Sequence, residues 1–173
     1  LDIVPVDFSK SYDPRELLKI IADQGEIDEF KPHYGKDMVV GLLKCGGHPL
    51  AFLSNYGPIQ AQGAGKAAQW ISLACQQGWP LVFFQNTTGF MVGSQAEHQG
   101  IVKRGSAFIQ AVTNAKVPKV TFLIGGSFGA GHYAMCGRAF DPRFIFAWPN
   151  QRLAVMGGKQ ASQVMDMLYL RSG

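Results

Sequence analysis

Hydrophobic and polar positions along the chain repeat one pattern three times: a short apolar run, a turn that contains glycine, and a stretch with helical spacing. The apolar runs and the turns that follow them are 81–85 with 86–89, 119–124 with 125–131, and 144–147 and 153–156 with 157–158. The helical stretches expected after these turns are 97–115, 132–136 and 159 onward. Short apolar strands that alternate with helices predict an α/β fold whose sheet is covered on both faces.

Upstream of these repeats, two apolar runs at 38–43 and 49–53 flank the sequence Cys-Gly-Gly-His, which predicts a β-hairpin. A helix is expected over 65–76, with four apolar residues on its buried face: Ala67, Trp70, Ile71 and Ala74. Asp13 followed by Pro14 is typical of a helix start, so a helix is expected from there through Ile21. Residues 1–12 are interpreted as a linker.

Composition narrows the class of protein. The 173 residues are 47% hydrophobic and 16% charged, which suits one globular domain with a sizeable core. The net charge of +4 comes from scattered lysines and arginines, which argues against nucleic-acid binding. The three cysteines, 45, 75 and 136, lack disulfide or zinc spacing, and no apolar run is long enough to cross a membrane. Leu1 in place of an initiator Met indicates a piece of a longer protein.

The segment Gly-Gly-Ser-Phe-Gly-Ala-Gly at 125–131 carries the most chemical information. Glycines where a strand turns into a helix permit positive φ and close approach to the backbone. The first N–H groups of the helix have no intrahelical acceptor and can hold a developing oxyanion. The alternative is a tight crossover whose glycines serve helix–strand packing.

Three generic motifs are weaker. Ser127 satisfies the GxSxG pattern of α/β-hydrolases, but His132 is the only later histidine and lies in the same turn, so no triad closes after Asp141 or Asp166. Residues 129–134 match GxGxxA, but the acidic residue expected about 20 positions later is missing. Residues 63–68 match the same pattern without a strand directly before them. No GK[ST] sequence follows these glycines, which excludes a P-loop.

The remaining polar residues suggest little acid–base machinery. The loop 86–93 either lines a pocket for a small polar ring or is an ordinary strand-end loop. Glu97 and Lys103 are interpreted as an ion pair, and three histidines (33, 48 and 98) as structural or exposed. Because no carboxylate pair or metal cluster accompanies the glycine turns, an enzyme of this kind would use backbone oxyanion holes and a cofactor.

Taken in order, seven segments of the chain resemble one family. They are 85–93, 117–121, 124–131, 135–138, 141–144, 148–150 and 155–158. Together they are similar to the carboxyltransferase β subunits of methylcrotonoyl-CoA and geranyl-CoA carboxylases. The resemblance covers nearly the whole chain from Asp13, so residues 13–173 are expected to be the C-terminal carboxyltransferase domain. The family's N-terminal domain, which holds most of the acyl-CoA site, and its final helical stretch are not in this sequence.

The resemblance implies a crotonase-like (ClpP/crotonase) superfold built from strand–glycine turn–helix units. It implies transfer of CO2 from carboxybiotin to the γ-carbon of a branched α,β-unsaturated acyl-CoA. The catalytic groups would be the backbone amides of Ala130 and Gly131, which bind the ureido oxygen of biotin. The residues implied to bind biotin are Thr88, Gly89, Phe90, Ser127, Phe128, Gly129 and Tyr133; those implied to bind acyl-CoA are Asn55 and Gly57.

The resemblance also implies the setting of this domain. Biotin is carried by a partner α subunit, further β subunits complete a hexamer, and the domain has no metal. Neither nucleic acid nor a membrane is expected as a partner, and the expected location is the bacterial cytoplasm or the mitochondrial matrix.

Two features qualify this assignment. His132 stands where the family usually has Asn. Four segments, 57–59, 66–69, 86–88 and 144–148, resemble geranyl-CoA carboxylases more than methylcrotonoyl-CoA carboxylases. The alternatives are a biotin-linked acyl-CoA decarboxylase subunit and a crotonase-like module used only for assembly.

Overall fold

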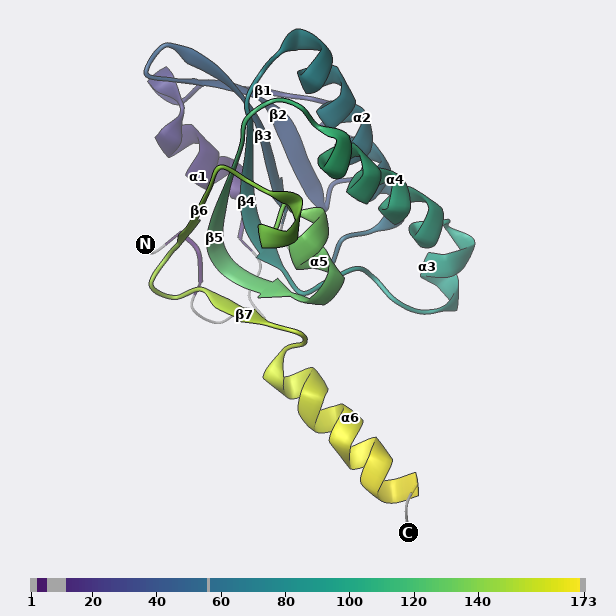
Figure 1. Cartoon of the computed structure of the whole chain (residues 1–173). Helices are drawn as coiled ribbons and strands as arrows, with labels where there is room; N and C mark the ends of the chain where they lie inside the picture. The colour runs from purple at the N-terminus through teal and green to yellow at the C-terminus, as the bar shows by residue number, and fades with distance from the viewer. Residues whose placement is uncertain (1–2, 6–11, 56, 172–173) are drawn as a thin grey trace.

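The structure, a computed structural model, describes residues 3–5, 12–55 and 57–171, and Figure 1 shows a single sheet with helices on both faces. The strands are β1 (Ile27–Glu29), β2 (Met38–Cys45), β3 (His48–Asn55), β4 (Leu81–Thr87), β5 (Lys119–Phe128), β6 (Phe144–Ala147) and β7 (Arg152–Ala154). The α-helices are α1 (Pro14–Ile21), α2 (Ala61–Gln77), α3 (Ser94–His98), α4 (Ile101–Asn114), α5 (Gly129–Ala134) and α6 (Gly158–Arg171). Short 3₁₀ turns, η1 (Asp23–Gly25) and η2 (Arg138–Phe140), complete the described elements.

The sheet is mixed, with strand order β1-β2-β3-β4-β5-β6 and β7 paired to β5. The first three strands are antiparallel, and β3 through β6 are parallel. The predicted hairpin is confirmed: Cys45 pairs with His48, and Gly46 and Gly47 form the two-residue turn with φ of 58° and 80°. Positive φ at both positions is what this kind of hairpin turn requires.

Alternating side chains of the sheet fill two separate cores. Along β2, Met38 and Val40 contact the core under α2 and α4, whereas Val39 and Leu43 contact the core under α1. Figure 1 shows the same division, with α2 and α4 on one face and α1 on the other. The α/β prediction with both sheet faces covered is therefore confirmed.

The early helices form where the sequence predicts them. The Asp13 carboxylate accepts a hydrogen bond from the Arg15 amide and caps α1. Helix α2 buries Trp70 and Ile71 as expected, begins earlier than predicted at Ala61, and ends at Gly78, whose φ is 71°.

Four further predicted boundaries are wrong. The helix expected over 132–136 begins earlier, at Gly129, and the strand expected over 153–156 ends at Ala154. The helix expected over 97–115 is divided into α3 and α4, because Gly100 between them has a φ of 79°. Strand β5 continues through the glycines at 125–126 to Phe128, so the turn is shorter than predicted. The extension is held by the Gly126 amide, which donates to the Asn86 side-chain oxygen at 2.9 Å, and by pairing of Ser127 with Thr87.

A buried cation joins the elements on the α2 side. Lys66 is fully buried, and its Nζ lies 3.6 Å from Glu29, which Arg15 also binds with two hydrogen bonds. Burial lowers the pKa of Lys66 and raises that of nearby Asp37, whose carboxylate accepts from the Gln60 amide. This network fixes α2 against β1 and α1.

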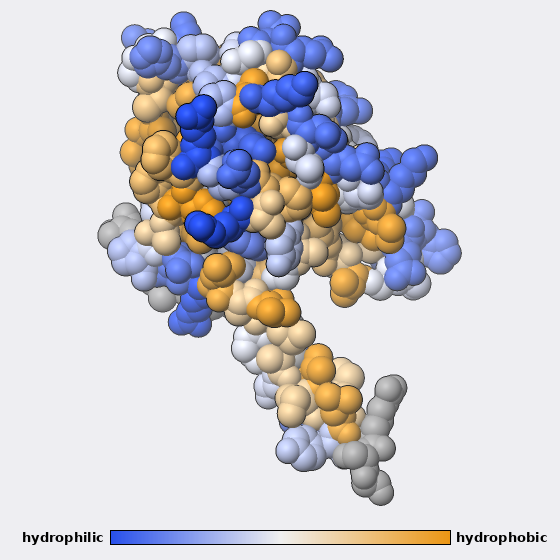
Figure 2. Space-filling model, viewed as in Figure 1, coloured by the Kyte–Doolittle hydropathy of each residue, from blue (hydrophilic) through white to orange (hydrophobic). Residues whose placement is uncertain are grey.

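The two ends of the described chain differ in how far their apolar side chains are buried. Within the segment predicted to be a linker, Val4 and Tyr12 are buried in the core under α1, and the linker interpretation stays a prediction. Helix α6 projects away from the sheet, and its apolar side chains are exposed, as Figures 1 and 2 show. These exposed apolar residues are Val164, Met165, Met167, Leu168 and Tyr169.

Candidate functional site

The candidate site lies where the carboxyl ends of β4 and β5 meet the start of α5. Because β4 and β5 are parallel, their carboxyl ends lie at the same edge of the sheet. Phe128 ends β5, Gly129 begins α5 with a φ of 54°, and Ala130 and Gly131 follow in the first turn. The amides of a first helical turn lack intrahelical acceptors and lie at the positive end of the helix dipole.

The glycines of this turn create space for neighbouring protein atoms. A Cβ on Gly131 would lie 2.9 Å from the Thr87 side chain and 3.0 Å from the Cα of Gly89. A Cβ on Gly125 would overlap the Asn86 carboxamide. Close packing therefore explains Gly125 and Gly131, which is the packing role that was expected from the sequence as the alternative to binding. Gly129 is needed for its positive φ.

The loop after β4 is held rigidly beside the turn. The Ile59 amide donates to the Gly89 carbonyl at 2.8 Å, and the Met91 amide donates to the Ile59 carbonyl at 2.9 Å. The Gly89 amide also donates to the Thr87 hydroxyl at 3.1 Å. Thr88 is exposed at the bend of this loop, so of the loop residues implied to bind biotin it is the most accessible.

An apolar cavity of about 460 Å³ opens beside the first turn of α5. It is lined by Phe90, Met91, Val92, Glu97, Ile101, Val102, Gly105, Ser106, Ile109, Gln110 and Ala130. The structure thus brings together Phe90 and Ala130, which the sequence placed in one site from separate motifs. The Phe90 ring lies 3.2 Å from where a Cβ on Gly105 would be, so this glycine lets the ring pack against α4.

The other predicted site residues divide by exposure. Ser127 and Phe128 are buried, whereas Tyr133 is 49% exposed and packs edge-on against Phe140. Asn55 is fully buried, and its side-chain amide donates to the carbonyls of Gly57 and Asn86, both at 3.2 Å. The side chain of Asn55 thus joins the ends of β3 and β4, and its assignment to acyl-CoA stays a prediction, as does that of Gly57.

A buried polar cluster lies directly behind the turn. The Ser127 hydroxyl lies 2.5 Å from the Gln85 side-chain oxygen and 2.8 Å from Nδ1 of His132. The Gln85 side-chain amide donates to the carbonyl of Met135 at 2.5 Å and to that of His132 at 3.4 Å. Burial lowers the pKa of His132, so the imidazole is neutral at physiological pH.

This cluster does not form a hydrolase triad. Ser127 is fully buried, and it contacts the same ring nitrogen of His132, Nδ1, as the Gln85 oxygen does, whereas a triad has the serine and a carboxylate on opposite ring nitrogens. Cys136, which is buried just after α5, is no better as a nucleophile, because burial raises the pKa of its thiol to about 11.

Sequence reasoning missed the structural role of Gln85 and Asn86. Both end the buried strand β4, and both use their carboxamides to hold the end of β5. The available signal was their position: polar side chains directly after four buried apolar residues must find partners inside the protein.

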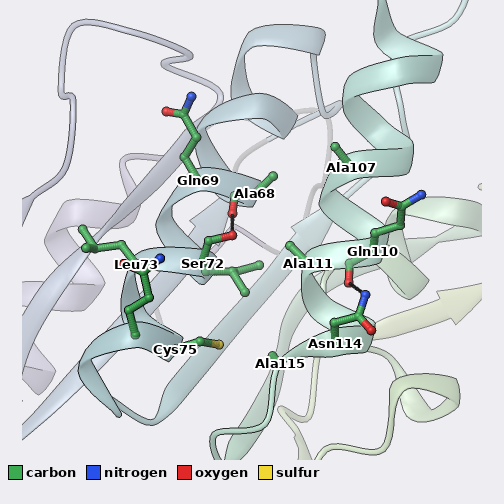
Figure 3. Close-up of a pocket in the computed structure, with 12 residues that line it drawn as sticks. Ala68, Gln69, Ser72, Leu73, Cys75, Ala107, Gln110, Ala111, Asn114 and Ala115 are labelled. Carbon is green, nitrogen blue, oxygen red and sulfur yellow. Dashed lines mark hydrogen bonds between the residues drawn. The ribbon is translucent and has the colours of Figure 1, made fainter.

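A second groove, of about 670 Å³, lies between α2 and α4 and is drawn in Figure 3. Its lining contains small apolar residues, amides and hydroxyls but no charged side chain. Ser72 there is bound to the Ala68 carbonyl, and Asn114 to the Gln110 carbonyl. The Ser72 hydroxyl and the Cys75 thiol are potential nucleophiles, but the lining contains no histidine, carboxylate or amine to activate either of them.

Two kinds of site are missing from the part of the chain that the structure describes. Nowhere in 3–5, 12–55 and 57–171 do three or more His, Cys, Asp or Glu side chains gather as a metal site would require. Within the same ranges, each helix is too short or too polar to span a bilayer.

Comparisons with solved structures show the fold. The crystal structure of the β subunit of P. aeruginosa geranyl-CoA carboxylase superposes with a TM-score of 0.96 at 53% identity, covering 99% of this chain and 33% of that one. The transcarboxylase 12S structure gives 0.90 at 32% identity, covering 94% and 33%. The fold is therefore the crotonase-like fold of carboxyltransferase β subunits.

The chain is also similar in sequence to curated β subunits of acyl-CoA carboxylases. A probable biotin-dependent acyl-coenzyme A carboxylase beta2 subunit from Mycobacterium tuberculosis is 49% identical over 97% of this chain and 32% of its own length. A mitochondrial methylcrotonoyl-CoA carboxylase beta chain from Dictyostelium discoideum is 47% identical over 96% of this chain and 28% of its own length. The chain thus spans about a third of the length of these relatives.

A family model for the carboxyl transferase domain matches residues 1–167, nearly the whole chain. This match and the relatives confirm the resemblance inferred from the seven sequence segments. The chain belongs to the carboxyl transferase domain family.

Proposed function

We propose that this chain supplies the biotin-side half of the carboxyltransferase site in a biotin-dependent acyl-CoA carboxylase. The observation that carries the proposal is the position of Ala130, which lies in the first turn of α5 and lines an apolar cavity. Helix-start amides beside a space suited to a small ring, together with membership of the carboxyl transferase family, support this assignment.

Biotin would supply the carboxyl group to be transferred and a ureido oxygen that accepts hydrogen bonds. The residues present fit such a ring: Phe90 and Ala130 line the cavity, and Thr88 and Tyr133 are exposed on the two segments that carry them. The missing Cβ of Gly131 keeps the first turn of α5 close to Gly89, so this part of the wall is backbone.

In this proposal the chain stabilises negative charge and does not act through a side-chain base. The amides of Ala130 and Gly131 would hold the ureido oxygen, and each oxyanion donor of this kind is worth about 3–4 kcal/mol in enzymes. His132 does not line the cavity, and its Nδ1 is engaged with Ser127, so it is not placed to act as a base there. The rigid loop that carries Gly89 would keep the ring oriented.

The substrate proposed is a branched α,β-unsaturated acyl-CoA, carboxylated at its γ-carbon. The relatives include enzymes named for methylcrotonoyl-CoA and geranyl-CoA. We favour geranyl-CoA, because identity to the geranyl-CoA carboxylase β subunit, 53%, exceeds the 46% to 49% found for four methylcrotonoyl-CoA carboxylase β subunits. Asn55 and Gly57 are assigned to the acyl-CoA side.

The proposed partners follow from the relatives. A biotin-carrying α subunit would bring the cofactor, and further β subunits would complete a hexamer, the assembly described for transcarboxylase 12S. The proposed location is the bacterial cytoplasm or the mitochondrial matrix, because the relatives are bacterial proteins or are named mitochondrial.

The test compares this chain with the full-length β subunit that contains it. The assay measures transfer of the carboxyl group from γ-carboxylated geranyl-CoA or γ-carboxylated methylcrotonoyl-CoA to free biotin, the reverse of the proposed reaction. The full-length subunit is expected to turn over, and this chain alone is expected to be inactive at dilute concentration, because the site is completed by another domain.

Two results would contradict the proposal. Turnover by the dilute chain alone would show that the site is not divided between domains. Failure of free biotin to perturb the amide resonances of residues 125–131 in the active full-length subunit would place biotin elsewhere.

A further inference from the structure

The hydrogen bonds behind the candidate site define the proton positions of its polar cluster. The Gln85 side chain has one orientation, because its NH2 group faces two carbonyl oxygens, those of Met135 at 2.5 Å and His132 at 3.4 Å. Its oxygen must therefore face Ser127 and the His132 ring, where it can only accept hydrogen bonds.

The Ser127 hydroxyl must therefore donate its single hydrogen bond to the Gln85 oxygen. Its hydroxyl oxygen lies 2.5 Å from the Gln85 oxygen, and two oxygens at this distance need a proton between them. Since Ser127 donates to Gln85, it has no proton left for Nδ1 of His132 at 2.8 Å. Nδ1 must donate instead, so His132 is the Nδ1–H tautomer and cannot deprotonate Ser127 through this contact.

The opposite edge of the imidazole is held by packing. A Cβ on Gly137 would overlap Nε2 of His132, so this glycine leaves room for the ring. The exposed Tyr133 ring packs edge-on against the imidazole, with centroids 5.8 Å apart and planes at 66°. His132 thus contacts both the buried cluster and an aromatic residue at the surface of the site.

We propose that His132 is a positioning residue that sets the first turn of α5 and the Tyr133 ring for biotin through the relay His132 to Ser127 to Gln85. The inference rests on the proposed function. Helix α5 has only six residues, so few intrahelical bonds define its direction. The residue directly after Gly131 is anchored twice, by its ring to β5 and by its carbonyl to β4.

The first test measures the tautomer and needs no activity. In the full-length enzyme with histidine labelled by ¹³C and ¹⁵N, the His132 signal is identified by its loss in His132→Asn and its retention in the control His48→Asn, whose histidine is exposed at the hairpin turn. The ring nitrogen and Cδ2 shifts are expected to report a neutral Nδ1–H tautomer. A neutral Nε2–H tautomer would overturn the relay.

The second test separates positioning from general structure. His132→Phe is expected to raise the KM for free biotin about tenfold, the effect of losing one buried hydrogen bond, without changing the KM for acyl-CoA. His132→Asn retains an N–H donor for Ser127 and is expected to recover most of the loss. Ser127→Ala, a small change that a folded core tolerates, should raise the KM for biotin to a similar extent.

Matched controls are His48→Phe and Ser72→Ala, which remove an exposed imidazole and an exposed hydroxyl outside the site. Unchanged biotin kinetics in His132→Phe and Ser127→Ala, or an equal rise in both KM values, would overturn the positioning role. A wild-type enzyme that transfers no carboxyl group to or from biotin would instead refute the proposed function, while the tautomer measurement would still decide the relay.

Discussion

The chain contains two glycine-rich turns that use glycine for opposite reasons. At the β2–β3 hairpin, Gly46 and Gly47 have φ of 58° and 80°, and a Cβ on either would meet no atom within 4 Å. At the β5–α5 turn, Gly125 and Gly131 have no such φ requirement, but a Cβ on either would collide with a neighbour. The hairpin turn needs glycine for backbone conformation alone. At the β5–α5 turn, Gly125 and Gly131 are needed for space, and only Gly129, with a φ of 54°, is needed for conformation.

The difference shows that a glycine-rich motif in a sequence can have two separate structural causes. A conformational glycine depends on its own φ and ψ and tolerates Asn at low cost. A space-making glycine depends on what lies beside it, which here is the Thr87 side chain and the Asn86 carboxamide from β4. Substitutions at the second turn should therefore affect the site, whereas those at the hairpin should affect stability alone.

The largest effect is expected for Gly131→Val in the full-length enzyme. A β-branched side chain would strike Thr87 and move the first turn of α5 away from its place beside Gly89. Biotin-dependent carboxyl transfer should fall about 100- to 1,000-fold, the loss typical of one oxyanion donor, while circular dichroism still reports a folded protein. Near-normal transfer by a folded variant would remove Gly131 from the site.

An intermediate effect is expected for Gly125→Ala, because the added methyl overlaps the Asn86 carboxamide, which must then release the Gly126 amide. Overpacking of this kind costs about 1–3 kcal/mol, measured as the free energy of unfolding in urea. Asn86→Ala together with Gly125→Ala should destabilise by less than the sum of the two single changes. Strict additivity would mean that the two residues do not compete for space.

A smaller effect is expected at the hairpin. Gly46→Val should cost about 1–2 kcal/mol of stability, because a β-branched residue is strained at positive φ. Gly46→Asn should cost much less, and both variants keep the backbone amide that donates to Asp23 at 2.9 Å. Thermal melting of the two variants provides the measurement, and a reduced kcat in either would contradict the separation of the turns.

The smallest effect is a pH dependence from His132. Its pKa is lowered by burial from the ordinary value of 6.5, so the unfolded state binds a proton more readily than the folded state. The stability contributed by the neutral imidazole is therefore complete above pH 6.5 and is lost as pH falls through the lowered pKa. Urea unfolding of the wild type and His132→Asn between about pH 7.5 and 5 should show a steeper loss in the wild type; equal slopes would contradict it.

Much of the fold could be predicted because its signals are local. The hairpin follows from two glycines between apolar runs, and α1 from the Asp13–Pro14 pair. The extension of β5 could not be predicted, because it depends on an acceptor from Asn86, 40 residues away. The division of 97–115 into two helices depends on the conformation of a single residue, Gly100.

The members of the candidate site that lie in local sequence motifs could be predicted, whereas the contacts between those motifs could not. Ala130 and Phe90 came from separate motifs, and their shared cavity required the parallel pairing of β4 with β5 and the packing of α4. The Gln85–Ser127–His132 cluster was missed because it joins three elements at close range. No periodicity in the sequence reports contacts of this kind.

The parallel pairing of β4 with β5 also fixes when the site forms during folding. The β2–β3 hairpin closes across a two-residue turn, and hairpins of this kind form in about 1–10 μs. The site instead requires Leu81 to find Lys119 across two intervening helices, a loop whose closure is entropically costly and slow. On the ribosome, therefore, a chain that has emerged only as far as α4 already contains its hairpin but none of the β5–α5 turn, and the edge of the sheet that carries the candidate site assembles after the hairpin.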